Sequence, residues 1–255
     1  MGELTVARTR DELVRLVPGD DFLRYAVPAV LPVPAYVCGG AVGVRHPAAR
    51  GGTALTLLGS PRAIDRWLDA TAAVVDLTTL HYVSVAAAAL SVVAPRLDLT
   101  RGGDWEWMST HTTPPPLEQE QLLVGLGPGD LGEVKALLAV ENSRTDARPG
   151  ERSNERWVGA RDASGALVAC GVREDGPGGY PELAGITVRS DQRGRGLGAA
   201  VTARLTREAI TGVGVCTLGM YADNAIARRV YHRLGYATVH QLSTRVPLRG
   251  SPVGR

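Results

Sequence analysis

Three glycines spaced two residues apart, Gly194, Gly196 and Gly198, form the pattern in this sequence that most directly indicates chemistry. They lie between an expected strand, residues 183–188, and an expected helix whose apolar residues recur every fourth position from Leu197 onward. The first turn of a helix has N–H groups without an intrahelical acceptor, and glycines leave them accessible because they carry no Cβ atom. The helix dipole favours an anion there. The segment therefore predicts a diphosphate site, with an ordinary tight turn as the alternative.

The segment does not fit two common nucleotide-binding motifs. No Gly-Lys-Ser or Gly-Lys-Thr follows the glycines, as a phosphate-binding P-loop requires. No strand with an acidic residue stands at the offset at which dinucleotide-binding folds hold the ribose. The usual P-loop and dinucleotide folds are therefore not indicated.

The segment resembles the acetyl-coenzyme A signature of the GNAT superfamily of N-acetyltransferases, Gln/Arg-x-x-Gly-x-Gly/Ala after the fourth strand, and residues 193–198 fit it in full. A second block is similar to the family's Asn-x-x-Ala-x-x-x-Tyr-x-x-x-Gly-Phe/Tyr. Its residues here are Asn224, Ala227, Tyr231, Gly235 and Tyr236. The two blocks are correctly ordered and cover residues 182–236, and the expected elements fit the family back to about residue 120.

The resemblance implies acetyl-coenzyme A as a co-substrate and no metal. In this family the fourth and fifth strands splay apart, and the pantetheine arm bonds to the backbone of the fourth, here residues 182–189. The amides that follow hold the pyrophosphate, where Arg195 is expected to add positive charge. The implied cofactor-binding residues are Ile186, Thr187, Val188, Arg193, Gly194, Arg195, Gly196, Leu197, Gly198, Ala199 and Asn224. Asn224 is explained equally well as a helix N-cap.

Two catalytic residues are implied by the same resemblance. Glu182 matches a glutamate that serves some members as general base, usually through water, and a solvated carboxylate at the strand end is its alternative. Tyr231 matches the tyrosine that protonates the departing thiolate, and a core tyrosine on the apolar helix face is its alternative. A main-chain N–H near Ile186 would polarise the thioester carbonyl.

Other polar side chains near these motifs receive different interpretations. His232 and His240 are chemically able to act as bases, but His232 follows Tyr231 around the helix and should face away from the same surface, which favours a solvated histidine. Glu141 and Asn142, after the first expected helix of this half, are expected to line the acceptor site.

Hydrophobic periodicity predicts the order of elements downstream of residue 120. Helices are expected after Asp130, at 196–210 and at 225–234, and strands at 121–126, 156–162, 166–172, 183–188, 215–221 and 238–246. Their order is βα, βββ, αβαβ. The predicted fold class is α/β with the GNAT fold, a mixed, mostly antiparallel sheet with splayed central strands flanked by helices, together with a second, smaller α/β domain.

Prolines at 114–116 predict an extended connection between two domains. The expected division is a degenerate GNAT-like or accessory domain at 1–113, a Pro-rich linker at 114–118 and an acetyltransferase domain at 119–250. The first domain should contain strands at 35–44, 53–58 and 104–108 and a helix at 62–75. Its nearest glycine signal is Gly59 followed by Pro61, which lacks an N–H, so it is not expected to hold coenzyme A in the same way. It resembles the degenerate half of tandem members and is expected to shape the acceptor site or a homodimer contact.

Composition bounds the compartment and the partners of this 255-residue chain. Residues 1–21 lack the compact apolar stretch of a secretory signal, and no apolar run could span a bilayer, so a cytoplasmic protein without membrane contact is expected. Cys38, Cys170 and Cys216 stand alone in apolar surroundings and are interpreted as buried free thiols. The arginines are scattered and not clustered, which disfavours nucleic-acid binding.

The expected reaction transfers an acetyl group directly from acetyl-coenzyme A to a primary amine, in a ternary complex without a covalent enzyme intermediate. The acceptor is expected to be a small-molecule or peptide amine. No motif selects among an amino acid, a polyamine, an aminoglycoside, a protein N-terminus and a protein lysine. The alternatives are a non-catalytic acyl-coenzyme A-binding sensor or regulatory module, and a transferase for a longer acyl chain.

Overall fold

The computed structural model of the protein describes residues 3–48, 51–152 and 154–248. Contacts divide the chain into two units. Within the described residues, the first unit contains the chain up to Trp107, Tyr221–Asp223 and the chain from Val239 on. The second contains Met108–Met220 and Asn224–Thr238.

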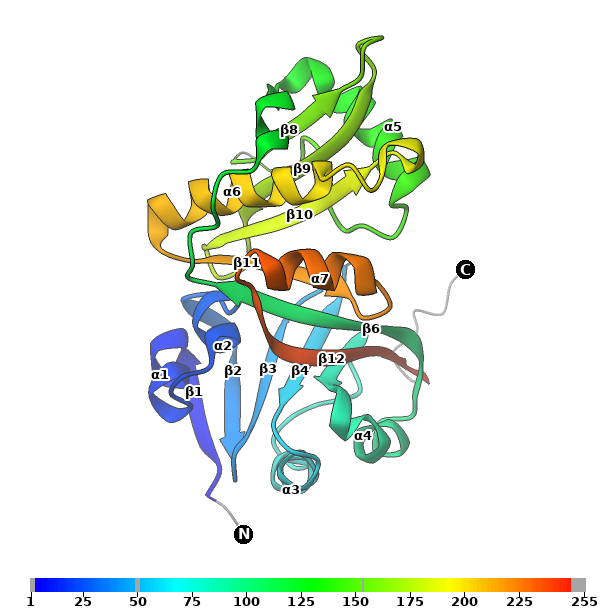
Figure 1. Ribbon diagram of the computed structural model, residues 1–255. Helices are drawn as coiled ribbons and strands as arrows, with labels where there is room; N and C mark the ends of the chain where they lie inside the picture. Colours follow the sequence, from blue (N-terminus) through cyan, green and yellow to red (C-terminus); the bar gives the residue numbers. More distant parts are fainter. Residues whose placement is uncertain (1–2, 49–50, 153, 249–255) are drawn as a thin grey trace. The chain divides into compact units, whose positions relative to one another are not determined.

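The second unit follows the element order predicted from the sequence (Figure 1). Its helices and strands are η2 (Glu118–Leu122), β7 (Leu123–Leu126), η3 (Pro128–Asp130), α5 (Leu131–Glu141), β8 (Arg156–Arg161), β9 (Leu167–Asp175), β10 (Pro181–Val188), η4 (Ser190–Gln192), α6 (Leu197–Val213), β11 (Cys216–Tyr221) and α7 (Ala225–Arg233). The strands run in the order β11-β10-β9-β8-β7. Only β10 and β11 are parallel, and the other neighbours are antiparallel. This is the mixed, mostly antiparallel sheet that was expected.

Helices α5 and α6 cover opposite faces of these strands. Helix α6 packs into a core cluster that includes Val158 and Ala169, whereas α5 packs into a cluster that includes Trp157 and Cys170. Successive side chains of a strand point to opposite faces, so the two clusters lie on the two sides of the sheet. The apolar residues predicted for α6 are all buried, namely Leu197, Val201, Leu205 and Ala209.

The first unit has its own cores and a second set of strands. Its elements are β1 (Thr5–Thr9), α1 (Arg10–Leu16), α2 (Asp21–Tyr25), β2 (Val30–Cys38), β3 (Ala41–Pro47), β4 (Thr53–Leu58), α3 (Pro61–Thr71), β5 (Tyr82–Ala86), η1 (Ala87–Ala89), α4 (Leu90–Arg96) and β6 (Leu99–Thr110). With β12 (Ala237–Pro247) the strand order is β1-β2-β3-β4-β5-β12-β6. Strands β4 and β5 are parallel, as β10 and β11 are in the second unit.

Both units repeat one order of elements. In each, a strand and helical segment precede three strands joined antiparallel, and a helix, a parallel strand and a further helix follow. The next strand along the chain is β6 after α4 and β12 after α7, and most of both strands belongs to the first unit. The first unit is therefore a structural counterpart of the second, although the sequence shows no internal repeat.

Several expectations for the first unit need correction. The strand expected at 35–44 is two strands, β2 and β3, because Gly39 and Gly40 adopt φ values of +55° and +85° and turn the chain into a hairpin. The helix expected at 62–75 ends at Thr71. The expected strand at 104–108 lies within the longer β6, where Trp105 and Trp107 share one core cluster as predicted. Elements β1, α1, α2, β5 and α4 are short, and their weak periodicity did not reveal them.

The two units also differ from the division expected at the prolines. The second unit begins at Met108, so residues 114–116 lie inside it. Strand β12 pairs with β5 of the first unit through Leu242 to Arg245. Hydrophobic periodicity identifies a strand but does not indicate which neighbouring strand it pairs with. The outer ends of the expected domains, residues 1–2 and 249–250, lie outside the described residues.

The structure bears on two expectations from composition, namely those for the cysteines and for membrane-spanning segments. All three cysteine thiols are buried and none forms a disulfide. Within the ranges that the structure describes, no helix is long and apolar enough to cross a membrane.

Candidate active site

Strands β10 and β11 pair over a short stretch only. Parallel pairing joins Glu182 to Thr217 and Leu183 to Leu218, and among the described residues it ends there. Strand β10 continues to Val188 and stays paired with β9 on its other side. Beyond Leu183, the edge of β10 toward β11 therefore has backbone N–H and C=O groups without a strand partner. An extended ligand can bind such an edge as an added strand does.

A β-bulge interrupts β10 in the middle of this open edge. The register with β9 shifts between Ala184 and Thr187, and Gly185 between them has a φ of +62°. A Cβ atom at Gly185 would lie 3.2 Å from the ring of Trp157, so the conformation and the tight packing both favour glycine. A bulge leaves one residue unpaired in the ladder. This bulge interrupts the pairing of β10 with β9 at residues 185–186, next to the open edge.

The glycine-rich segment forms the N-terminus of α6, as predicted. Gly194 and the N-cap residue Gly196 adopt left-handed φ values of +79° and +84°. The first helical hydrogen bond runs from Ala200 N to Gly196 O, and no described residue accepts a hydrogen bond from the N–H groups of residues 194–199. Residues 193–196 are exposed, and a Cβ atom at Gly194 would meet nothing within 4 Å. These N–H groups are available to an anionic ligand.

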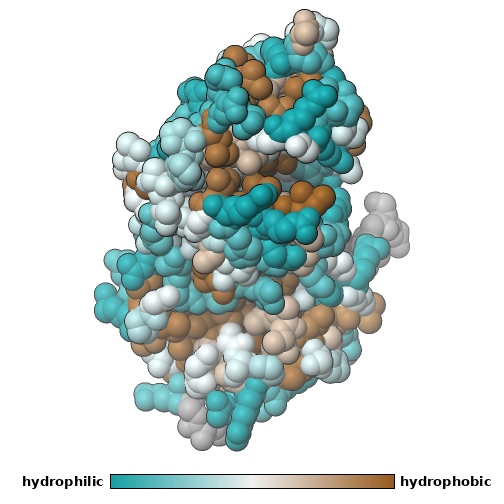
Figure 2. Space-filling model, in the orientation of Figure 1, coloured by the Kyte–Doolittle hydropathy of each residue, from teal (hydrophilic) through white to brown (hydrophobic). Residues whose placement is uncertain are grey.

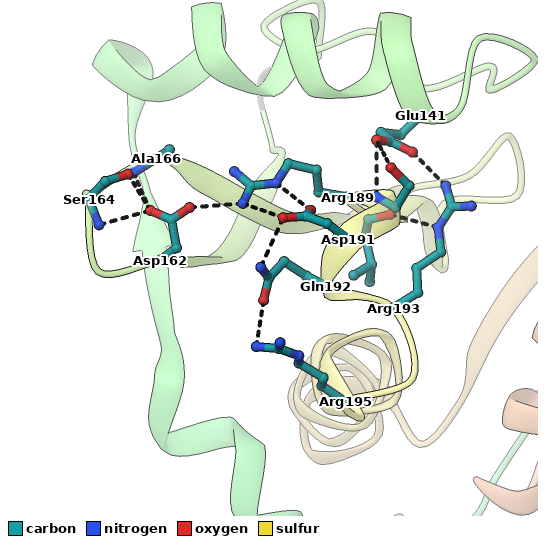
Figure 3. Close-up of polar contacts among 11 residues, drawn as sticks. Glu141, Asp162, Ser164, Ala166, Arg189, Asp191, Gln192, Arg193 and Arg195 are labelled. Atoms are coloured by element: carbon teal, nitrogen blue, oxygen red, sulfur yellow. Dashed lines mark hydrogen bonds and ion pairs between the residues drawn. The ribbon is translucent and has the colours of Figure 1, made fainter.

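A chain of polar contacts holds the turn between β10 and α6 (Figure 3). Arg189 lies between two carboxylates, with Nε 2.6 Å from Asp191 Oδ1 and Nη2 3.0 Å from Asp162 Oδ2. Gln192 donates to Asp191 Oδ2 and accepts from Arg195 Nη1 at 3.0 Å. The hydrogen bond from Arg189 is the main cause that lowers the pKa of Asp191 to about 2. Asp191 is therefore ionised across the neutral range and keeps the turn braced.

Glu141, at the end of α5, holds the other side of the same turn (Figure 3). Its Oε1 atom accepts from both the N–H and the hydroxyl of Ser190 at 3.0 Å, and its Oε2 lies 2.6 Å from Arg193 Nη2. The backbone hydrogen bond from Ser190 is the main cause that lowers the pKa of Glu141. Glu141 therefore braces the loop, and the expectation that it lines the acceptor site stays a prediction.

The two arginines of the glycine-rich segment are placed differently. Arg193 donates from Nε to Val188 O at 3.1 Å, and its N–H donates to Ser190 O at 3.4 Å. Its donors are thus engaged within the protein, and the run of N–H groups without an acceptor starts at Gly194. Arg195 is exposed and contacts only the neighbouring Gln192 among described side chains, so its charge is available beside the loop.

Glu182 lies near the start of β10, at the other end of the open edge from the glycine loop. At about 3.3 Å per residue, roughly 20 Å of strand separates the two. Burial, followed by the neighbouring Glu174 carboxylate, raises the pKa of Glu182 to about 7. A Cβ atom at Gly176 would lie 2.5 Å from Glu182 Oε2, so glycine leaves room for this carboxyl group. A group that exchanges its proton near neutral pH is suited to general base catalysis.

Tyr231 is buried in the core of the second unit, with 8% of its surface exposed. Its ring packs against Tyr236 with the centroids 5.9 Å apart, and burial raises the pKa of Tyr231 to about 12. The Tyr236 hydroxyl bonds to Thr206 Oγ1 at 2.7 Å, whereas no described residue hydrogen-bonds to the Tyr231 hydroxyl. Buried tyrosine hydroxyls usually find a partner. The Tyr231 hydroxyl is therefore available to a ligand.

The remaining candidate residues either have a structural role or are exposed to solvent. Asn224 caps α7 by accepting from Ala227 N at 3.0 Å, in agreement with its N-cap interpretation. His232 is exposed on α7, over which hydrophilic residues gather in Figure 2. His240 is half-buried in the first unit, where its Nε2 lies 2.9 Å from Asp20 Oδ2, and does not belong to the site.

Sequence reasoning missed several residues that build the site. Asp162 braces Arg189, and Glu174 stands directly opposite Glu182 on the neighbouring strand. Neither residue belongs to a motif, because strand pairing brings them to the site from distant segments. Asn142, which was expected to line the acceptor site, donates to Thr187 Oγ1 at 3.0 Å and so contacts β10 beside the bulge.

Comparisons with known proteins agree with this geometry. Residues 157–245 match the family model described as FR47-like protein. Among curated proteins, no sequence matches significantly. A GCN5-related N-acetyltransferase from Kribbella flavida is 19% identical over 84% of this chain and 89% of that chain, with a TM-score of 0.55.

Two further solved structures are similar over nearly the whole chain. A GCN5-related N-acetyltransferase from Sphaerobacter thermophilus is 15% identical over 94% of this chain and 88% of that chain, with a TM-score of 0.56. An acetyltransferase from the GNAT family from Colwellia psychrerythraea is 15% identical over 96% and 99%, with a TM-score of 0.54. The chain thus has the fold of GNAT acetyltransferases across both units, and it carries the FR47-like sequence pattern in residues 157–245.

Proposed function

We propose that the second unit transfers an acetyl group from acetyl-coenzyme A directly to a primary amine. One observation carries this proposal, namely the open edge of β10 that leads to the unpartnered N–H groups of residues 194–199. The edge suits an extended arm with amide groups, and the N–H groups suit a diphosphate at the end of that arm. Coenzyme A combines these two features in this order. The charge of Arg195 favours the same ligand.

The main chain of the second unit does most of the binding in this proposal. Backbone groups of Ile186, Thr187 and Val188 hold the arm, and the N–H groups of residues 194–199 hold the diphosphate. Glu141 and Asp162 contribute indirectly, because they keep the turn in place. When bound, acetyl-coenzyme A supplies the activated acetyl group as a thioester.

Two side chains move protons in the proposed reaction. Glu182, with a pKa near 7, takes a proton from the acceptor nitrogen through water, which is needed because an ammonium group has no lone pair for attack. Tyr231 stays protonated at neutral pH and gives its proton to the departing thiolate sulfur. The nitrogen loses its second proton to water as the amide forms, and water returns a proton to Tyr231. A main-chain N–H at the bulge stabilises the negative charge that develops on the carbonyl oxygen. The acceptor is a small-molecule or peptide amine.

Release of free thiol from acetyl-coenzyme A in the presence of an amine library tests this function. At least one primary amine should increase thiol release above the protein-free rate, and mass spectrometry should find that amine acetylated. Binding of acetyl-coenzyme A without turnover of any amine would instead identify a sensor. Faster turnover with butyryl- or octanoyl-coenzyme A than with acetyl-coenzyme A would change the assigned acyl chain.

A further inference from the structure

Glu174 and Glu182 form a pair of carboxyl groups across two neighbouring strands. The two residues are direct partners in the antiparallel register of β9 and β10. Direct partners project to the same face of a sheet, with Cβ atoms about 5 Å apart. Glu174 is buried, with 7% of its side chain exposed, whereas Glu182 is half-buried at the proposed site of proton transfer. Two like charges this close are unfavourable, so the pair needs a compensating group.

Arg152 supplies this compensation, and it does so at Glu174. Arg152 Nη1 lies 3.1 Å from Glu174 Oε1 and donates to Asp175 O at 3.0 Å. Among the described residues, no ion pair joins Arg152 to Glu182. Burial raises the pKa of Glu174, and the ion pair with Arg152 opposes this rise. Because Arg152 pairs with Glu174 and not with Glu182, the negative charge of the pair is favoured on Glu174. A proton bound by the pair then lies on Glu182.

The turn that carries Arg152 is firmly anchored. Glu155 accepts hydrogen bonds from Arg152 N at 2.9 Å, Gly150 N at 2.8 Å and the buried Trp157 Nε1 at 2.6 Å. These contacts tie the backbone at Arg152 to the core of the second unit. The fold therefore fixes the backbone from which the exposed Arg152 side chain reaches Glu174.

The charged groups that act on the pair come from two of the three segments around it. Strand β9 contributes Glu174, and the turn before β8 contributes Arg152, Asp146 and Glu155. Glu174 and Asp146 favour the protonated form of Glu182, and Arg152 opposes it. On the third side, the β11 residue opposite Glu182 is Thr217, which carries no charge. Of the acidic groups, Glu174 raises the pKa of Glu182 most, and it is the direct register partner of Glu182.

We infer that Glu174, held ionised by Arg152, is a positioning residue that sets the pH range in which Glu182 accepts a proton from the acceptor. This inference rests on the proposed function. The proton moves from the ammonium nitrogen, through water, to a carboxylate oxygen of Glu182, and the nitrogen keeps its electron pair for attack on the thioester carbon. The Glu174 charge strengthens the proton affinity of Glu182. Without it, Glu182 would be a weaker base at neutral pH.

Two variants with opposite expected signs test the inference. Glu174→Gln removes the neighbouring negative charge, and the acidic limb of kcat/KM against pH should move about one unit toward lower pH. Arg152→Gln removes the opposing positive charge, and the same limb should move toward higher pH. Glu151→Gln removes a charge from the same turn at an exposed position and serves as the control with an unchanged profile. If both variants lowered the rate equally at all pH values, the residues would be merely structural and the inference would fail.

A titration without substrate separates this inference from the proposed function. The carboxyl carbon of Glu182 can be followed by ¹³C NMR against pH in the full chain, with Glu182→Gln identifying the signal. The midpoint should fall in Glu174→Gln and rise in Arg152→Gln. An unchanged midpoint in both variants would overturn the inference, whether or not the protein acetylates an amine. Shifted midpoints in a protein that acetylates no amine would refute the proposed function and leave the coupling of the pair in place. If Glu174→Gln does not fold, Arg152→Gln is tested alone. A higher midpoint of the Glu182 titration in that variant would support the inference, and an unchanged midpoint would overturn it.

Discussion

Burial acts on two proton-exchanging side chains of the second unit, Glu182 and Tyr231. It raises the pKa of Glu182 to about 7, so this carboxyl group gains and loses its proton in the neutral range. It raises the pKa of Tyr231 to about 12, so the phenol keeps its proton at the same pH. The carboxylate is therefore suited to accept a proton and the phenol to donate one. This difference underlies the two predictions made for single residues.

Replacing Tyr231 by phenylalanine should separate proton donation from coenzyme binding. The variant keeps the ring and its packing against Tyr236 but removes the hydroxyl, which has no described protein partner. We expect kcat to fall by about 100-fold or more, the usual contribution of a general acid, with acetyl-coenzyme A affinity unchanged by calorimetry. A kcat within a factor of two of the parent value would instead identify Tyr231 as a core residue.

Replacing Glu182 by glutamine should change stability in a pH-dependent way. The pKa of Glu182 is raised in the folded state, so the folded protein holds this proton more tightly than the unfolded chain does. Stability is therefore lost as pH rises from about 4.5 to about 7 and stays lower above that range. The Glu182→Gln variant does not lose stability in this way, because glutamine does not titrate. Its free energy of unfolding should exceed that of the parent protein by about 1–3 kcal/mol at pH 8, and the difference should vanish near pH 4.5. Urea denaturation at both pH values measures it, and an equal stability at pH 8 would contradict the raised pKa.

The junction of β10 with α6 is the element that positions the ligand in the proposed function. Its features are the open edge beyond Leu183, the bulge at Gly185 and the N–H groups of residues 194–199. The contacts made by Glu141 and Asp162 hold the turn from both sides. Each feature depends on backbone geometry more than on a particular functional side chain. A test at this scale must therefore change the loop without changing its fold.

Aspartate and asparagine at Gly194 provide such a test. Gly194 has a φ of +79° and open space around the position of a Cβ atom, and both residues tolerate the left-handed region. The two side chains have the same shape, so they differ only in charge. Gly194→Asp should weaken acetyl-coenzyme A binding at least ten times more than Gly194→Asn, and the gap should narrow at high salt. Equal affinities of the two variants in titration calorimetry would place the diphosphate elsewhere.

On the scale of the whole molecule, the first unit repeats the architecture but lacks both binding features. Strand β4 pairs with β5 over four consecutive positions, from Ala54 with Tyr82 to Leu57 with Val85, and so offers no comparable open edge. The N-terminus of α3 is capped by Ser60, whose Oγ accepts from Ala63 N at 3.3 Å, and the next residue is a proline without an N–H. The counterpart of the glycine loop is therefore closed to a diphosphate by its own residues.

The chain should accordingly bind one acetyl-coenzyme A. Calorimetric titration of the parent protein is expected to give a stoichiometry of about one per chain, because in the part of the chain that the structure describes only the second unit combines an open strand edge with unpartnered N–H groups. The Gly194→Asp variant should then show no residual high-affinity site. A stoichiometry of two, or a full-strength site that remains in this variant, would show that the first unit binds the coenzyme as well.

Local patterns made part of this architecture predictable. The order of elements in the second unit followed from hydrophobic periodicity, because helix and strand periods depend on neighbours within a few residues. The glycine loop at the start of α6 was predictable for a similar reason, since Gly194 and Gly196 adopt a conformation that other residues disfavour. In the first unit the same reasoning missed β1 and β5, which have 5 residues each, and merged β2 with β3 across a tight turn.

The amino-acid sequence by itself determined the element order of the second unit, the glycine-rich helix start and the positions of Glu182 and Tyr231 in the motif blocks. Only the tertiary structure decided that β10 parts from β11 after Leu183, that Glu174 stands beside Glu182 and that β12 joins the first unit. The physical reason is that strand register and edge choice depend on contacts between distant segments. Burial and charge at the site follow from those contacts, and with them the proton affinity of Glu182.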